Sequence, residues 1–152
     1  MLFHVPECIF VARNMARDIF HDIVKVALEK DGWTITDNHL RLSAINEVKL
    51  ETDLGGSKVI GAAFESQRIA VEVKGFQRPS LVYEFHAAYG QYLIYEDVIE
   101  RRNLDWVLHL AIPDSVFKIL KELEHIMYSI AKRNLRILLF NPDKKIITSW
   151  IS

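Results

Sequence analysis

The feature that most limits the fold of this chain is a strand followed by a long helix and then a second strand. Residues 68–76 read RIAVEVKGF, where apolar and polar side chains alternate as in a half-buried strand. Residues 80–101 carry apolar side chains at helical spacing, and residues 105–112 read as a buried strand. This passage forces a crossover, because parallel strands in one sheet cannot be joined by a tight turn. The sequence therefore predicts an α/β fold.

The remaining segments extend this unit into a central mixed β-sheet flanked by helices on both faces. The predicted order is αβββαβαββ, with antiparallel strands before the crossover and a further strand pair at the end. The predicted elements are helix 16–30, a short strand 33–36 with a turn at 37–39, a meander of strands 48–54, 58–64 and 68–76, helix 80–101, strand 105–112, helix 113–132, and strands 135–140 and 146–151.

Length and charge indicate one ordinary globular domain. The chain has 152 residues, 19 basic and 20 acidic, so it lacks the overall positive charge that drives non-specific binding to nucleic acid. Any contact with DNA must therefore be local. The single cysteine, Cys8, excludes an intramolecular disulfide framework and fits a reducing cytoplasm. No apolar stretch is long enough to cross a bilayer, and the first residues do not resemble a secretory signal.

Three charged side chains form a candidate metal site. Glu72 and Lys74 are two residues apart in a strand, so they project from one face while Ile69 and Val71 project from the other. Asp53 ends an earlier strand of the same meander, and strand pairing can bring its carboxylate close to Glu72. Two carboxylates suit Mg²⁺, which can activate water at a phosphodiester, and the lysine can stabilise the developing charge. Alternating charge on a strand is more often a solvated face, so the pair alone identifies no site.

The helix that follows adds two candidates. Gln91 and Tyr95 are four residues apart and so lie on one helix face, at the edge of the apolar stripe, from which they can reach the sheet. Without a site, Tyr95 would pack at the core with its hydroxyl at the rim, and Gln91 would be an ordinary exposed residue. Arg78 lies close to the proposed site in sequence and could track a phosphate backbone.

Three segments together resemble the XisH family of fdxN-element excision controlling factors. They are residues 20–36 (FHDIVKVALEKDGWTIT), 69–76 (IAVEVKGF) and 84–91 (EFHAAYGQ). The resemblance runs from about residue 15 to residue 150, which leaves residues 1–14 as an N-terminal extension of a single domain, 15–152. The family is similar in fold to the restriction-endonuclease-like PD-(D/E)XK nucleases.

This resemblance implies a role for each candidate residue. Asp53 and Glu72 would be the Mg²⁺ or Mn²⁺ ligands, Lys74 and Gln91 would complete the catalytic set, and Tyr95 with Arg78 would contact substrate. Gln91 and Tyr95 further resemble the Q-x-x-x-Y element of RecB-like nucleases. Several nucleases of this class place another acid on the first helix, where this chain has His21 and Asp22. A capping or surface role for those two residues is the favoured interpretation.

Two functions fit these expectations. The first is control of DNA-element excision through a nuclease-like, Mg²⁺-dependent DNA-processing site, with a recombinase involved indirectly. The second is a non-catalytic regulatory module that binds DNA or protein and acts with a companion factor of the XisI type. A homodimer is a further expectation, and whether the chain is an enzyme stays open between the two functions.

Overall fold

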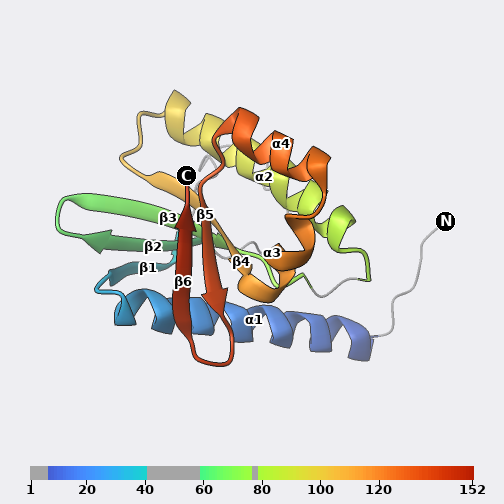
Figure 1. The fold of residues 1–152 in the computed structure, drawn as a ribbon. Coiled ribbons are helices and arrows are strands. Elements are labelled where there is room, and N and C mark those ends of the chain that lie inside the picture. The colour runs from blue at the N-terminus through green and yellow to red at the C-terminus, as the bar shows by residue number, and fades with distance from the viewer. Residues whose placement is uncertain (1–6, 41–58, 77–78) are drawn as a thin grey trace.

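The computed structural model describes residues 7–40, 59–76 and 79–152, with side chains from residue 19 onward. One sheet separates a long helix from the other helices (Figure 1). The elements are α1 Glu7–Lys30, β1 Thr34–Leu40, β2 Val59–Phe64, β3 Gln67–Val73, α2 Leu81–Arg101, β4 Val107–Pro113, α3 Asp114–Leu120, α4 Glu124–Arg133, β5 Ile137–Asn141 and β6 Ile146–Ile151.

The sheet is mixed, as the crossover predicts. Its six strands lie in chain order from β1 to β6. β3, β4 and β5 are parallel neighbours, and antiparallel pairs β1–β2, β2–β3 and β5–β6 flank them. Helix α2 makes the crossover from β3 to β4, so the strand, helix, strand prediction is confirmed. The architecture is compatible with a restriction-endonuclease-like fold.

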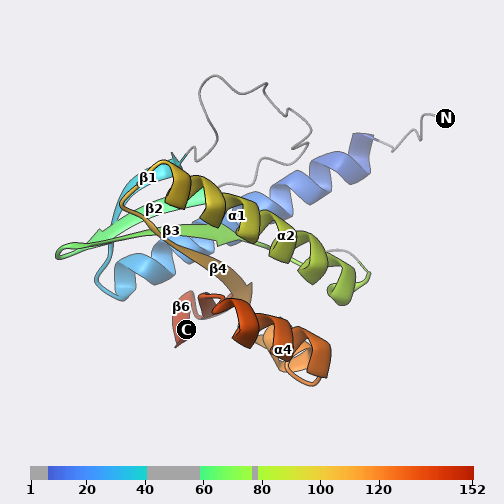
Figure 2. The ribbon, with the colours of Figure 1, turned by 90° about the horizontal axis from the view of Figure 1, so that it is seen from above.

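Each face of the sheet has its own core. The α1 face packs Val24 and Leu28 of α1 against Ile69 and Val71 of β3. The α2 face packs α2, α3 and α4 on the alternate residues of the same strands, among them Ala70. Figure 2 shows α1 and α2 crossing the strands from opposite sides. The period-two alternation of β3 divides its residues between the two faces, as expected. However, residues 69–72 are buried on both faces because helices cover both, so β3 is not the half-buried strand that the pattern indicates.

The first strand departs from the prediction. Residues 37–39 were expected to form a turn, whereas β1 continues through them to Leu40. The pairing of β1 with β2 shifts register twice, on either side of Asp37. Because β1 is the outermost strand among the described residues, its pairing is confined to β2 there, and irregular pairing tolerates Asp, Asn and His. The turn prediction is wrong for this reason.

The helix predicted over residues 113–132 is two helices. α3 ends at Leu120, and α4 begins at Glu124 after Leu123, which is extended (φ −97°, ψ 108°). Apolar residues keep helical spacing through the break, so periodicity alone could not reveal it. Pro113, predicted to begin that helix, is the last residue of β4.

Other predicted elements also differ from the structure in their bounds or cannot be compared with it. Helix α1 begins at Glu7, inside the segment predicted to be an extension. The predicted strand 48–54 lies outside the described residues. None of the described helices is long and apolar enough to span a membrane.

Candidate functional site

A buried carboxylate lies on the α2 face, near the end of β3. Glu72 on β3 pairs with Val59 of β2 on one side and Leu110 of β4 on the other, and its exposed fraction is 0%. Aliphatic neighbours on both sides would leave an isolated carboxylate strongly disfavoured. A carboxylate held in this place must therefore be compensated by nearby charge or hydrogen bonds.

Lys74 supplies the nearest positive charge. Its Nζ lies 3.4 Å from Glu72 Oε1, and its side chain is 23% exposed. Its backbone N–H donates to the carbonyl of Ala111 on β4, which holds the residue against the sheet just past the end of β3. The ammonium therefore stands between a buried carboxylate and solvent.

Helix α2 extends this contact into a chain of polar groups. Lys74 Nζ donates to Gln91 Oε1 at 2.6 Å, and Gln91 Nε2 donates to Tyr95 Oη at 2.9 Å. The four-residue spacing of Gln91 and Tyr95 puts both on one helix face, as expected. Glu72, Lys74, Gln91 and Tyr95 thus form one connected set, which we call the Glu72 cluster.

The N-terminal end of α2 is fixed locally by a capping residue. Ser80 is extended, and its hydroxyl accepts a hydrogen bond from the Tyr83 N–H at 3.2 Å, as an N-cap does.

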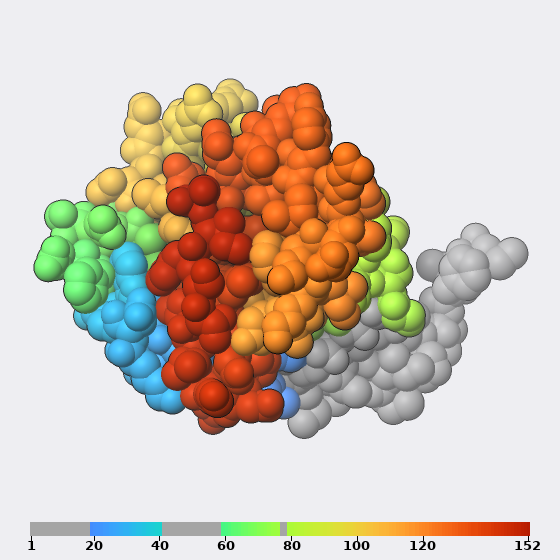
Figure 3. All heavy atoms as spheres, in the orientation of Figure 1, coloured from blue at the N-terminus to red at the C-terminus, as the bar shows by residue number. Residues whose placement is uncertain are grey.

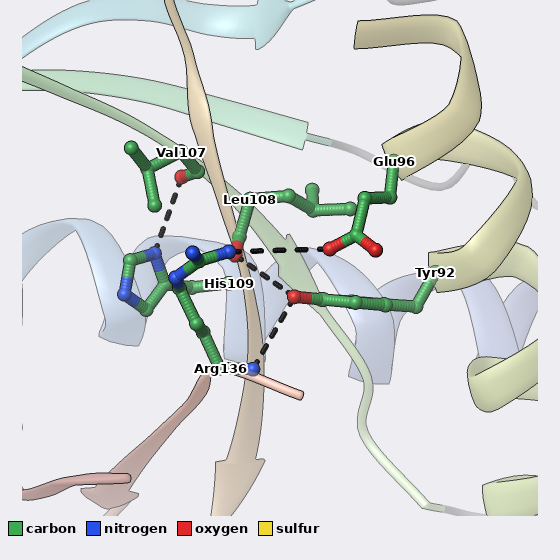
Figure 4. A network of polar contacts seen from close by, with 6 residues as sticks. All are labelled: Tyr92, Glu96, Val107, Leu108, His109 and Arg136. Atoms are coloured by element: carbon green, nitrogen blue, oxygen red, sulfur yellow. Dashed lines mark hydrogen bonds and ion pairs between the residues drawn. The ribbon is translucent and has the colours of Figure 1, made fainter. Parts of the chain in front are cut away.

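A second anchor of α2, on Tyr92, was missed by sequence reasoning. Its hydroxyl donates to the Leu108 carbonyl of β4 and accepts from the Arg136 N–H that precedes β5, both at 3.2 Å (Figure 4). Burial raises the pKa of this hydroxyl above its usual value. Arg136 Nη1 also lies 3.9 Å from Glu96 Oε2, one helical turn further along α2. In the sequence, Tyr92 is one of the residues of the apolar stripe of this helix. No local pattern identifies hydrogen-bond partners that lie so far along the chain.

His109 on β4 is a further titratable group near this network. Its Nδ1 lies 3.2 Å from the Val107 carbonyl (Figure 4), and its ring meets Trp150 edge to face at 5.2 Å between centroids. Burial, together with the positive charge of Arg136, lowers the pKa of His109 from 6.5 to about 4, although the hydrogen bond to the Val107 carbonyl acts in the opposite direction. The imidazole is therefore neutral at pH 7.

The predicted site residues are brought together in part. Glu72, Lys74, Gln91 and Tyr95 are joined, whereas Asp53 and Arg78 lie outside the described residues. In residues 7–40, 59–76 and 79–152, no group of three or more His, Cys, Asp or Glu side chains gathers into a metal site. Of the two predicted acidic ligands, Asp53 and Glu72, only Glu72 lies among the described residues.

The two candidates on the first helix, His21 and Asp22, lie in different environments. His21 is buried, with 4% exposed, and its ring stacks on that of His39 of β1 at 5.3 Å. The expected surface or capping role is wrong for His21, because it continues the stripe of α1 that packs on the sheet through Val24. Asp22 points to solvent, so a surface position is correct for it.

Comparison with known proteins gives a consistent result. A family model described as XisH protein matches residues 15–148. A crystal structure of an XisH family protein from Nostoc punctiforme is 38% identical, with a TM-score of 0.78, covering 89% of this chain and 100% of that one. A crystal structure of an fdxN element excision controlling factor protein from Anabaena variabilis is 36% identical, with a TM-score of 0.78, covering 90% and 100%. Among curated protein sequences none matches.

Proposed function

Since this chain belongs to the XisH family, we propose that it controls excision of a DNA element of the fdxN type, through a DNA-processing site built on the Glu72 cluster. The similar Anabaena variabilis protein is described as an fdxN element excision controlling factor, which supports the first half of the proposal. The second half rests on one observation, a fully buried carboxylate coupled to a lysine and to two polar residues of α2.

The cost of burying Glu72 supports a functional reason for its presence. A hydrophobic residue of similar size would fill the space between Val59 and Leu110 without desolvating a charge. Buried charges of this kind concentrate at functional sites. An E-x-K strand beside a Q-x-x-x-Y helix is also the arrangement of RecB-like members of the PD-(D/E)XK class.

The donor chemistry fits a hard divalent cation in part. Glu72 offers carboxylate oxygens, the ligands that Mg²⁺ and Mn²⁺ prefer, and Asp53 is the second carboxylate that we assign to the cation. When bound, the cation would supply a more acidic water and charge compensation at the phosphodiester. Glu72 would hold the cation, and Asp53 would complete its acidic ligands.

The other members of the cluster act on position and charge. Lys74 would direct its ammonium at the phosphate oxygens and stabilise the charge that develops there. Gln91 holds the lysine Nζ at 2.6 Å, and Tyr95 holds Gln91, so the two α2 residues orient the lysine. Arg78 would contact the DNA backbone.

A cleavage assay tests this proposal. Wild-type protein, Glu72→Gln and the exposed control Glu122→Gln are incubated with linear, branched and single-stranded DNA in the presence of Mg²⁺ or Mn²⁺. We expect cutting of at least one DNA form, lost by about 10²–10³-fold in Glu72→Gln and unchanged in Glu122→Gln. Equal cutting by all three proteins would remove Glu72 from the site, and no cutting by any would argue against a nuclease.

A second function, a non-catalytic module that binds a companion of the XisI type, is favoured by different features. The charge is nearly balanced, with 19 basic and 20 acidic residues, and apolar side chains are exposed away from Glu72, including Phe64 (39%) and Trp150 (40%). Under this function, Glu72→Gln would leave excision in cells intact, while the purified companion would co-elute with the chain in size-exclusion chromatography.

A further inference from the structure

The two edge strands of the sheet differ in how well they are protected against pairing with another strand. β1 ends one side with Asp37, Asn38 and His39 in the strand and with two register shifts against β2. β6 ends the other side with the sequence IITSWI, which contains no charge and no proline. No described strand lies beyond either edge. Charges and irregular pairing are the usual protection of an open edge, and β6, with one register shift and no charge, has less of this protection than β1.

The surface around β6 is exposed and apolar. Ile146 and Trp150 are 36% and 40% exposed, and the β5–β6 hairpin lies on the open front of the molecule in Figure 3. Trp150 belongs to a group of three aromatic rings. The ring centroid of Trp33 lies 5.9 Å from that of Trp150, and the ring centroid of Phe64 lies 5.6 Å from that of Trp33. An uncharged open edge beside exposed aromatic rings fits an uncharged partner strand.

The side chains on the two faces of β6 determine which partner strand can pair with its open edge. Its pairing with β5 shifts between Leu139 and Phe140, so Thr148 is an extra residue. Ile147 pairs with Phe140 and Trp150 pairs with Leu138, and both of those β5 residues belong to the α1-face core. Ile147 and Trp150 therefore share a face although they are three residues apart.

By the same argument, Ile146 and Ile151 share the α2 face. They pair with Asn141 and Ile137, which alternate with Phe140 and Leu138 along β5. The two members of each pair, Ile147 with Trp150 and Ile146 with Ile151, are equally far along the chain from the point between Thr148 and Ser149. A strand identical to β6, laid antiparallel beside it, would place Ile147 opposite Trp150 and Ile146 opposite Ile151.

We propose that β6 is a dimer interface that pairs with β6 of a second copy of this chain. A two-fold axis perpendicular to the sheet keeps each face on its own side, so only residues that share a face can lie opposite each other. The bulge at Thr148 makes the symmetric register meet this condition, with apolar residues opposite apolar residues and Thr148 opposite Ser149 of the second copy.

The expected dimer is weak. A six-residue strand pair and its aromatic border are small beside the roughly 1,600 Å² buried in a standard stable interface. We therefore expect a dissociation constant in the micromolar range. The inference does not depend on the proposed nuclease site, since Glu72 lies on β3, three strands from β6.

Sedimentation equilibrium of the full chain between ~1 and ~300 µM tests the proposal. Thr148→Lys puts like charges beside the axis and should weaken the dimer at least about tenfold, whereas the matched edge variant Asn38→Lys on β1 should not change it. Mixing Thr148→Lys with Thr148→Glu should restore association. Hydrogen exchange of residues 146–151 should slow as the wild-type concentration rises.

Three results would overturn the proposal. The wild type could remain monomeric up to ~300 µM. The dimer could be weakened equally by Asn38→Lys, which would place the interface elsewhere. Protection of residues 146–151 could arise only when a companion protein is added, which would assign the edge to a different partner. Thermal unfolding of each variant checks that the monomer remains folded.

Discussion

The two faces of the sheet differ in what they bury. The α1 face is apolar at its centre, where Val24 and Leu28 pack on Ile69 and Val71, and its buried polar side chain, His21, stands at one end against His39. The α2 face buries the carboxylate of Glu72 and the hydroxyl of Tyr92. The α1 face therefore stabilises the fold by apolar burial, whereas the α2 face also buries the Glu72 carboxylate, which is desolvated at a cost to stability.

The largest expected effect on stability lies on the α1 face. Leu28→Ala removes a fully buried side chain and should lower the free energy of unfolding by about 2–5 kcal/mol. The measurement is urea denaturation followed by circular dichroism. Ile19→Ala on the same helix, where the side chain is 56% exposed, should change stability by less than about 0.5 kcal/mol. Similar losses in the two variants would show that α1 does not pack as described.

A smaller effect is expected for the polar anchor of α2. Tyr92→Phe leaves the Leu108 carbonyl and the Arg136 N–H without their hydroxyl partner, and should cost about 1–3 kcal/mol. Tyr128→Phe is the matched control, because that ring is 65% exposed. If Tyr92→Phe were as stable as the control, the link from α2 to the strands would carry no net energy.

The pH dependence of stability tests the burial of His109. Its pKa is about 4 when folded and near 6.5 when unfolded, so the unfolded chain takes up the proton first as pH falls. Stability should therefore drop between pH 6.5 and about 4, by about 1–2 kcal/mol after allowance for partial solvent exposure. Urea titrations at several pH values should show the drop in the wild type and in His125→Gln, which alters an exposed histidine, but not in His109→Gln.

The smallest effect is expected at the N-cap of α2. Ser80→Ala removes the hydroxyl that accepts from the Tyr83 N–H and should cost about 1 kcal/mol. Ser115→Ala, an exposed serine in α3, gives the baseline in the same thermal melts. A cost at Ser80 no larger than at Ser115 would mean that α2 is held by its packing alone.

Much of this architecture could be predicted from periodicity. The alternation of β3 and the crossover helix led to a mixed sheet, and the spacing of Glu72 with Lys74 and of Gln91 with Tyr95 put each pair on one face. These features depend on backbone geometry over a few residues, which is the range in which sequence patterns are informative.

What could not be predicted depends on distant contacts. The break at Leu123 interrupts a helix whose apolar spacing is continuous, and β1 passes through residues that usually form turns because its edge position tolerates irregular pairing. The partners of Tyr92 lie 16 and 44 residues away. Asp53 and Arg78 lie outside the described residues, so their places in the site stay predictions.

The proposed role of Glu72 on the α2 face is to bind a divalent cation. Calorimetric titration of Mn²⁺ into wild-type protein and Glu72→Gln tests it most directly, with urea denaturation of both proteins alongside. We predict binding by the wild type, loss of binding in Glu72→Gln, and a stability of the variant close to that of the wild type, because the desolvated charge is removed while Lys74, which is 23% exposed, keeps its hydrogen bond to Gln91. No binding by the wild type, or a large loss of stability in the variant, would contradict the claim and make Glu72 a structural partner of Lys74.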